Sequence, residues 1–213
     1  MRSSRWARSP IRSSDPVTID ETTLRRLLRE RKARRSAGPG TARAAAVLVG
    51  IEPARGVWLT RRSAHLVHHA GQVALPGGTV DPSDASPEAA ALREAEEEIG
   101  LDPGAVELLG RLDDFGTGTG FHITPVTALI HGTPEFRMAP DEVVAVFPLR
   151  LELLLDPALP EWRKGTWHGG TREFPVWPHP DHVIWGATAW ILYQLALTLR
   201  EGVSAAAAEA ASA

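Results

Sequence analysis

The chain has 213 residues and a formal net charge of -3, which predicts one domain of ordinary size without a basic field to hold a nucleic acid. Hydrophobic residues make up 43% of it, enough for a core, and no run of about 18 apolar residues predicts a membrane span. Cysteine is absent, which excludes disulfides, thiolate catalysis and cysteine-based zinc sites. The absence also suits a reducing compartment, so we expect a cytoplasmic protein without nucleic-acid or membrane partners.

Residues 1–22 are expected to form a basic tail before the domain. Residues 1–12 are rich in arginine and serine and contain no acidic residue. This composition is typical of a disordered tail, and a transit peptide is the alternative. We place a single domain at residues 23–202 and an alanine-rich tail at 203–213.

The first half of the domain is predicted to contain a helix, a strand hairpin, a short third strand and a second helix. Residues 23–35 carry leucines at helical spacing, and apolar runs of strand length follow at 44–51, 57–60 and 73–75. Ser86 suits a helix N-cap, Pro87 the first helical position and Gly100 a left-handed C-cap. The second helix is therefore predicted to end at Ile99.

The second half is predicted to add three strands, a hairpin and an apolar helix. Strand-like runs lie at 106–112, 123–130 and 143–149. The glycine-rich loop at 116–120 opens no helix and lacks the following lysine of a phosphate-binding loop, so we expect a flexible connection. A helical turn is predicted at 151–155, a hairpin at 162–177 centred on Gly169 and Gly170, and a helix at 185–200 closed by Gly202. The chain after residue 204 is expected to fray or to be disordered.

Residues 93–101, with the sequence REAEEEIGL, place three carboxylates on one side of a helical turn. Glu94 and Glu98 are four residues apart, with Glu97 beside them, and such like charges repel by about 0.2–0.5 kcal/mol per pair. A bound dication would remove that repulsion, and oxygen ligands favour a hard ion such as Mg²⁺ or Mn²⁺. Arg93 can pair with Glu97 and orient it. A solvated acidic helix face is the alternative for these residues taken alone.

The segment 78–101 resembles the Nudix box, G-x5-E-x7-R-E-U-x-E-E-x-G-U, in which U is aliphatic. Asp84 stands where the box has its first glutamate, and the loop is one residue longer. The resemblance implies an α/β fold, an α/β/α sandwich around a mixed sheet, and a metal-dependent pyrophosphohydrolase. It also implies metal ligands at Glu94, Glu97, Glu98 and the Gly77 carbonyl, and catalytic roles for Arg93 and Glu97.

A second match is similar to the coenzyme A diphosphatase subfamily. Residues 59–63 (LTRRS) and 69–78 (HAGQVALPGG) resemble its pattern L-L-T-x-R-S-x-x-L-R-x-H-x-G-Q-V-x-F-P-G-G. Val67 stands where the pattern has arginine, and Leu75 where it has phenylalanine. A looser match, residues 185–189, resembles the closing helix of that subfamily. The resemblance implies cleavage of coenzyme A (CoA) or its derivatives to 3′,5′-ADP and 4′-phosphopantetheine, with substrate-binding roles for Arg61, Arg62, His69 and Gln72.

The substrate, the general base and the tryptophans each leave an alternative open. Another nucleoside diphosphate derivative, such as ADP-ribose or NADH, suits the same box, and a catalytically silent nucleotide-binding module would share the fold. Glu142, just before a predicted strand, is our candidate for the general base, and a solvated turn carboxylate is its alternative. The tryptophans between 162 and 190 are expected in the core, with adenine stacking as the alternative.

Overall fold

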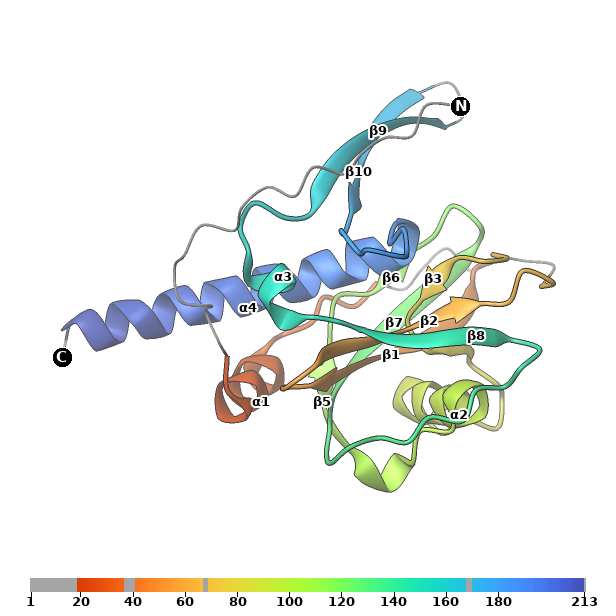
Figure 1. Ribbon diagram of the computed structural model, residues 1–213, viewed down its shortest axis with the longest axis horizontal. Coiled ribbons are helices and arrows are strands. Elements are labelled where there is room, and N and C mark those ends of the chain that lie inside the picture. The colour runs from red at the N-terminus through yellow and green to blue at the C-terminus, as the bar shows by residue number, and fades with distance from the viewer. Residues whose placement is uncertain (1–18, 37–40, 67–68, 168–169, 213) are drawn as a thin grey trace.

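A central sheet lies between helices in the computed structural model, which describes residues 19–36, 41–66, 69–167 and 170–212 (Figure 1). The elements in chain order are α1 (Glu21–Glu30), β1 (Arg43–Glu52), β2 (Gly56–Arg62), β3 (Val73–Ala74), β4 (Gly77–Thr79), α2 (Pro87–Ile99), η1 (Pro103–Ala105), β5 (Val106–Arg111), β6 (Phe115–Gly116), β7 (Phe121–Ile130), β8 (Val143–Leu149), α3 (Leu151–Leu155), β9 (Glu161–Trp167), β10 (Gly170–Val176) and α4 (Gly186–Ser212).

The main sheet is mixed, as the sequence predicts. Its strands follow the order β3-β2-β1-β7-β5, and β8 pairs with β2, β4 with β1 and β6 with β7. Strands β1 and β7 run parallel from Arg43 opposite Phe121 to Ile51 opposite Leu129. The other pairings in this sheet are antiparallel.

Each face of the sheet is covered by helices, which confirms the α/β/α sandwich. Alternation along β1 sends Ala46 and Leu48 into one apolar cluster and Val49 and Ile51 into the other. Helix α2 packs on the first cluster through its small side chains and Ile99, whereas α1, α3 and α4 pack on the second. In the part of the chain described, no helix combines the length and apolar character needed to cross a bilayer.

Helix α2 has the predicted ends. The Ser86 hydroxyl accepts a hydrogen bond from the Ala89 amide at 3.2 Å, which satisfies one of the free N–H groups of the first turn. Gly100 adopts φ 66°, and its N–H donates back to the last turn. The helix that carries the carboxylates is thus fixed at both termini.

The N-terminal boundary predicted at residue 22 is wrong. Helix α1 begins at Glu21 because the Asp20 side chain caps it, accepting from the Thr23 amide at 2.7 Å. Ile19 is buried in the core with Leu24, so residues 19–22 belong to the domain. The helix also ends at Glu30, earlier than the predicted 35. The predicted tail at 1–18 lies outside the described residues.

The prediction that the last helix closes at Gly202 is also wrong, because α4 continues to Ser212. The predicted frayed or disordered tail is therefore helical where it is described. A Cβ at Gly202 would overlap the side chain of Leu27. The glycine thus permits a close crossing of α1 and α4, and it does not terminate the helix.

Strands β9 and β10 form a separate hairpin that projects past α4 (Figure 1). The predicted hairpin is confirmed, although Gly169 at its predicted centre lies outside the described residues. The expectation of core tryptophans holds for Trp177, which is fully buried, and is wrong for Trp162 and Trp185, which are 46% and 38% exposed.

Candidate active site

The candidate site lies where α2 passes β4. The sequence predicts a short strand at 73–75, and the structure adds a second one, Gly77–Thr79, which pairs with β1. A Cβ at Gly78 would lie 2.5 Å from Cδ of Glu94, so glycine leaves the room that this carboxylate occupies. The Gly77 amide donates to Oε2 of Glu98 at 3.2 Å. Both glycines therefore bring backbone against the carboxylates of α2.

Glu98 is the buried member of the carboxylate cluster, with 3% of its surface exposed. Besides the Gly77 amide, Nη1 of Arg62 donates to its Oε1 at 3.2 Å. Burial raises the pKa of Glu98 to about 7, and the negative charges of Glu94 and Glu142 add to the rise, while the Gly77 bond and Arg62 oppose it. The alternative of a solvated acidic face is therefore wrong for Glu98.

Glu94 and Glu97 extend the cluster toward solvent. Arg93 donates from Nη1 to Oε1 of Glu94 at 3.0 Å and to Oε2 of Glu97 at 2.9 Å, as its spacing from Glu97 predicts. Burial raises the pKa of Glu94, whose side chain is 18% exposed, whereas that of Glu97 is 61% exposed. The three carboxylates thus form a series that runs from the protein interior to the surface.

Arg93 is held by Asp84, a contact that sequence reasoning missed. Nε and Nη2 of Arg93 donate to the two oxygens of Asp84, each at 3.0 Å, and Nη2 also donates to the Thr79 carbonyl at 3.2 Å. The Arg93 guanidinium lowers the pKa of Asp84, whose side chain is 6% exposed. The contact could have been suspected because Asp84 stands where the Nudix box has its first glutamate.

Glu142 directly precedes β8, the strand that pairs with β2. Its carbonyl accepts from the Ser63 amide at 2.7 Å, which fixes the backbone just before β8. Its negative charge contributes to the raised pKa values of Glu94 and Glu98. Its own side chain is exposed, so solvent reaches it. The structure thus brings the predicted base candidate toward the α2 carboxylates.

The donor set of this cluster fits a divalent cation. Five carboxylates face two guanidinium groups, which leaves an excess of negative charge that a dication would offset in part. All the side-chain donors are oxygens, the ligands of hard ions. The carboxylates belong to Asp84, Glu94, Glu97, Glu98 and Glu142, and the guanidinium groups to Arg62 and Arg93.

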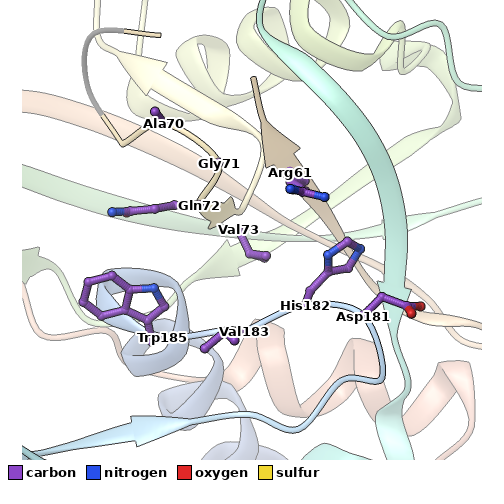
Figure 2. A pocket seen from close by; sticks show the side chains of 9 residues that line it. All are labelled: Arg61, Ala70, Gly71, Gln72, Val73, Asp181, His182, Val183 and Trp185. Carbon is purple, nitrogen blue, oxygen red and sulfur yellow. The ribbon is translucent and has the colours of Figure 1, made fainter. Parts of the chain in front are cut away.

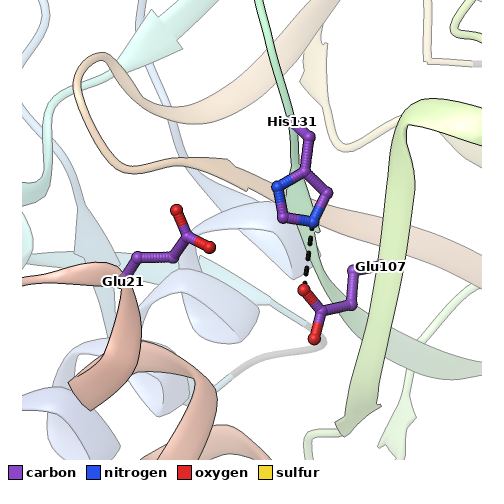
Figure 3. Close-up of side chains that lie close together, drawn as sticks. All are labelled: Glu21, Glu107 and His131. Atoms are coloured by element: carbon purple, nitrogen blue, oxygen red, sulfur yellow. Dashed lines mark hydrogen bonds and ion pairs between the residues drawn. The ribbon is translucent and has the colours of Figure 1, made fainter.

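A different group, Glu21, Glu107 and His131, converges within 4.8 Å among the described residues (Figure 3). Arg25 donates to both oxygens of Glu107, at 2.8 and 2.9 Å, and Arg29 donates to it at 2.7 Å. These contacts lower the pKa of Glu107 to about 2, with Arg25 as the main cause. Two arginines already neutralise this group, so it serves as an ion-pair joint between α1 and β5.

A cavity of about 220 Å³ opens on the other face of the sheet (Figure 2). Arg61 and Gln72, two of the predicted substrate-binding residues, line it. His69 does not line it but contacts Gln72, with its Nδ1 3.1 Å from Oε1 of the amide. Arg62 does not line it and contacts Glu98 instead. Val67 lies outside the described residues.

The consecutive residues Arg61 and Arg62 therefore point to opposite faces of the sheet. Alternation along β2 turns Arg62 toward α2 and Arg61 toward α4. Sequence reasoning missed the far wall of the cavity, which Asp181, His182 and Trp185 supply from the segment before α4. The only local signal was the looser motif match at 185–189.

The chain is similar to a known protein family and to several known proteins. The family described as NUDIX domain matches residues 41–168. An Escherichia coli (strain K12) protein described as "Uncharacterized Nudix hydrolase NudL" is 45% identical over 163 residues, which cover 74% of this chain and 83% of the relative. A Shigella flexneri protein of the same description is 43% identical over 190 residues, which cover 86% of this chain and 95% of that protein.

Two solved structures are also similar. A MutT NUDIX hydrolase from Burkholderia pseudomallei is 24% identical with a TM-score of 0.43, and the match covers 72% of this chain and 97% of that one. An ADP-ribose pyrophosphatase from Streptococcus suis is 19% identical with a TM-score of 0.46, and the match covers 76% and 92% of the two chains.

Proposed function

Since the chain belongs to the Nudix hydrolase family, we propose that it hydrolyses the diphosphate of CoA or its derivatives to 3′,5′-ADP and 4′-phosphopantetheine. Nudix hydrolases cleave phosphorus anhydrides in nucleoside diphosphate derivatives, and the choice of CoA is the proposal. One observation carries it: the chain joins the α2 carboxylate cluster to the second motif, whose Arg61 and Gln72 line a cavity. A small-molecule nucleotide is thus the expected partner, and a cytoplasmic location stays a prediction from the missing cysteines.

The carboxylates of α2 are the proposed metal ligands. Glu94, Glu97 and Glu98 would hold Mg²⁺ or Mn²⁺, with the Gly77 carbonyl as a further donor. A divalent ion there would supply charge neutralisation for the diphosphate and a lowered pKa for the attacking water. In the structure Arg93 and Arg62 form ion pairs with these carboxylates and offset part of their negative charge.

Other residues orient the cluster and move the proton. Arg93 positions Glu97 through a direct hydrogen bond, and Asp84 holds Arg93 at both of its oxygens. Glu142 is the proposed general base, because it is solvent-exposed and its charge acts on the metal-ligating carboxylates. In this role Glu142 would accept the proton of the water that attacks phosphorus.

The proposal is tested by comparing kcat/KM for CoA, ADP-ribose and NADH with Mg²⁺ and with Mn²⁺. We expect CoA to give the highest value. A strong preference for ADP-ribose or NADH would refute the CoA assignment and leave the family assignment intact. No turnover of any substrate with either metal would favour the alternative of a silent nucleotide-binding module.

Val67→Arg offers a sharper test of CoA recognition. Arginine is suited to bind a phosphate through two hydrogen bonds, and the subfamily pattern has arginine at this position. A charge-assisted contact contributes about 1.5–3 kcal/mol, which is roughly 10- to 150-fold in affinity. We expect wild type to cleave CoA with a high KM, and Val67→Arg to lower that KM, less so if Arg61 and Arg62 compensate. The KM for ADP-ribose, which lacks the extra phosphate, serves as the control.

A further inference from the structure

The cavity of Figure 2 presents an aromatic surface that the proposed chemistry does not use. The indole of Trp185 lines the cavity and is 38% exposed. Exposing a large aromatic ring to water costs free energy that burial against another ring would recover. Gln72 lies beside it along the same side of the cavity (Figure 2).

The backbone around Trp185 is fixed on both sides. Ile184 is fully buried and accepts a hydrogen bond from the Trp177 amide at 3.0 Å. One turn later, the buried hydroxyl of Thr188 donates to the Val73 carbonyl at 3.1 Å. Trp185 is therefore exposed on a rigid support, and a ligand that stacks on it has little chain to order.

The opposite end of the cavity carries the guanidinium group of Arg61. Arg61 and His182 face one another there (Figure 2). The His182 ring packs against Phe147 at an interplanar angle of 30°, with centroids 4.1 Å apart, which holds its position. Asp181 lies at this same end, with its carboxylate directed away from Trp185 (Figure 2). One end of the cavity thus suits a flat ring and the other suits an anion.

We propose that this cavity is the nucleobase subsite, in which Trp185 stacks on the adenine ring and Gln72 hydrogen-bonds to its edge. An amide offers both a donor and acceptors, as a base edge requires. Arg61 at the other end binds a phosphate of the same nucleotide. Arg61 and Arg62 are neighbours in β2, so the cavity and the carboxylate cluster each adjoin one of two consecutive residues. This inference rests on the proposed function, since it takes the ligand to be an adenine nucleotide.

The test is ADP binding by calorimetry to the full chain in EDTA, where hydrolysis does not interfere. Base stacking on an aromatic side chain contributes roughly 5- to 150-fold in affinity at single-stranded nucleic-acid sites, so we expect Trp185→Ala to weaken ADP binding by about 5-fold or more. Trp185→Phe should recover most of the affinity. Trp162→Ala is the matched control, because Trp162 is 46% exposed and does not line the cavity. Its affinity for ADP should equal that of wild type.

Ligands without a base separate stacking from other effects. Binding of ribose 5-phosphate should be the same in wild type and Trp185→Ala, and an equal loss for both ligands would overturn the proposal. Unchanged ADP affinity in Trp185→Ala would also overturn it, as would a lack of ADP binding by wild type. A loss of affinity confined to 4′-phosphopantetheine would overturn it too and would assign the cavity to the other half of CoA. None of these outcomes bears on CoA turnover with Mg²⁺, so failure of the subsite and failure of the proposed function are distinguishable.

Discussion

Helix α2 and the start of α4 lie on opposite faces of one sheet, and each supports a different kind of binding chemistry. Helix α2 holds charges that repel one another, and it is short, capped at both ends and pressed against β4. The cavity beside α4 relies on an indole and one arginine, and its fixed points are single hydrogen bonds at Ile184 and Thr188. Mutually repelling groups need a stiff support, whereas a stacking surface needs only a fixed backbone.

The largest expected effect is on the α2 face. Glu97→Gln should lower kcat by at least about 100-fold, since metal stabilisation of the transition state contributes several kcal/mol. The Glu97 side chain is 61% exposed, so the melting temperature (Tm) should not change. The control is Glu96→Gln, an exposed glutamate on the same helix, which should turn over like wild type. Comparable kcat values for the two variants would contradict the carboxylate assignment.

Glu98 should make the metal-free protein more stable at lower pH. Its pKa rises from an ordinary 4.5 to about 7 on folding, so the folded state binds the proton more tightly than the unfolded state. The stabilisation is complete below about pH 4.5 and is lost as the pH rises through 7. The shift corresponds to about 3 kcal/mol for this buried group.

That prediction is checked by thermal unfolding in EDTA between pH 5 and pH 8. Glu98→Gln should be more stable than wild type at pH 8, and its advantage should shrink as the pH falls. Glu96→Gln should keep the wild-type profile. A difference between wild type and Glu98→Gln that does not vary with pH would show that burial does not shift this carboxyl group. The same variant should lose activity, because it removes a proposed metal ligand.

A smaller effect is expected where Asp84 orients Arg93. Residues that orient a metal ligand from behind typically contribute 10- to 100-fold, and we expect Asp84→Asn to lower kcat by about 10-fold. Asp81→Asn is the control, because Asp81 lies in the same loop and its side chain accepts from Ser83. If the two variants have equal kcat, Arg93 does not depend on Asp84 for its position.

The smallest effect is expected at the end of α4. Ending the chain after Ser204 should lower Tm by less than about 2 °C, since residues 205 and 208 are exposed. Ending it after Arg200 should lower Tm further, because it removes Gly202 and Val203, which pack against α1 and the core. Equal melting temperatures for the two truncations would show that the crossing adds no stability. Removal of residues 1–14 is also expected to leave Tm unchanged.

Local signals predicted α2 well because its determinants are local. The cap at Ser86, the C-cap at Gly100 and the spacing of Arg93 and Glu97 all act within a few residues. The mixed sheet and the sandwich followed from the motif resemblance, and the strand positions followed from apolar runs. The pairing of Arg93 with Glu97 needed only helical geometry.

The features that were missed depend on contacts between distant segments. Gly202 alone predicts the end of a helix, because its contact with Leu27 cannot be inferred from the local sequence. Trp185 is predicted to be a core residue because composition carries no information on which ring lines the same cavity as Arg61. The burial of Glu98 follows from its packing against Arg62 and β4, which helical periodicity does not reveal.

Because α1 packs against α4, the N-terminal helix can complete its packing only late in synthesis of the chain. The Arg31 side chain hydrogen-bonds to Thr198, 167 residues further along, and Leu27 packs at Gly202. Leu24 and Leu28 therefore lack part of their final surroundings until nearly the whole chain has left the ribosome. Contacts of such long range slow folding and leave apolar surface exposed meanwhile. We thus expect nascent chains that stop short of α4 to be aggregation-prone, even though the carboxylate cluster precedes that point in the sequence.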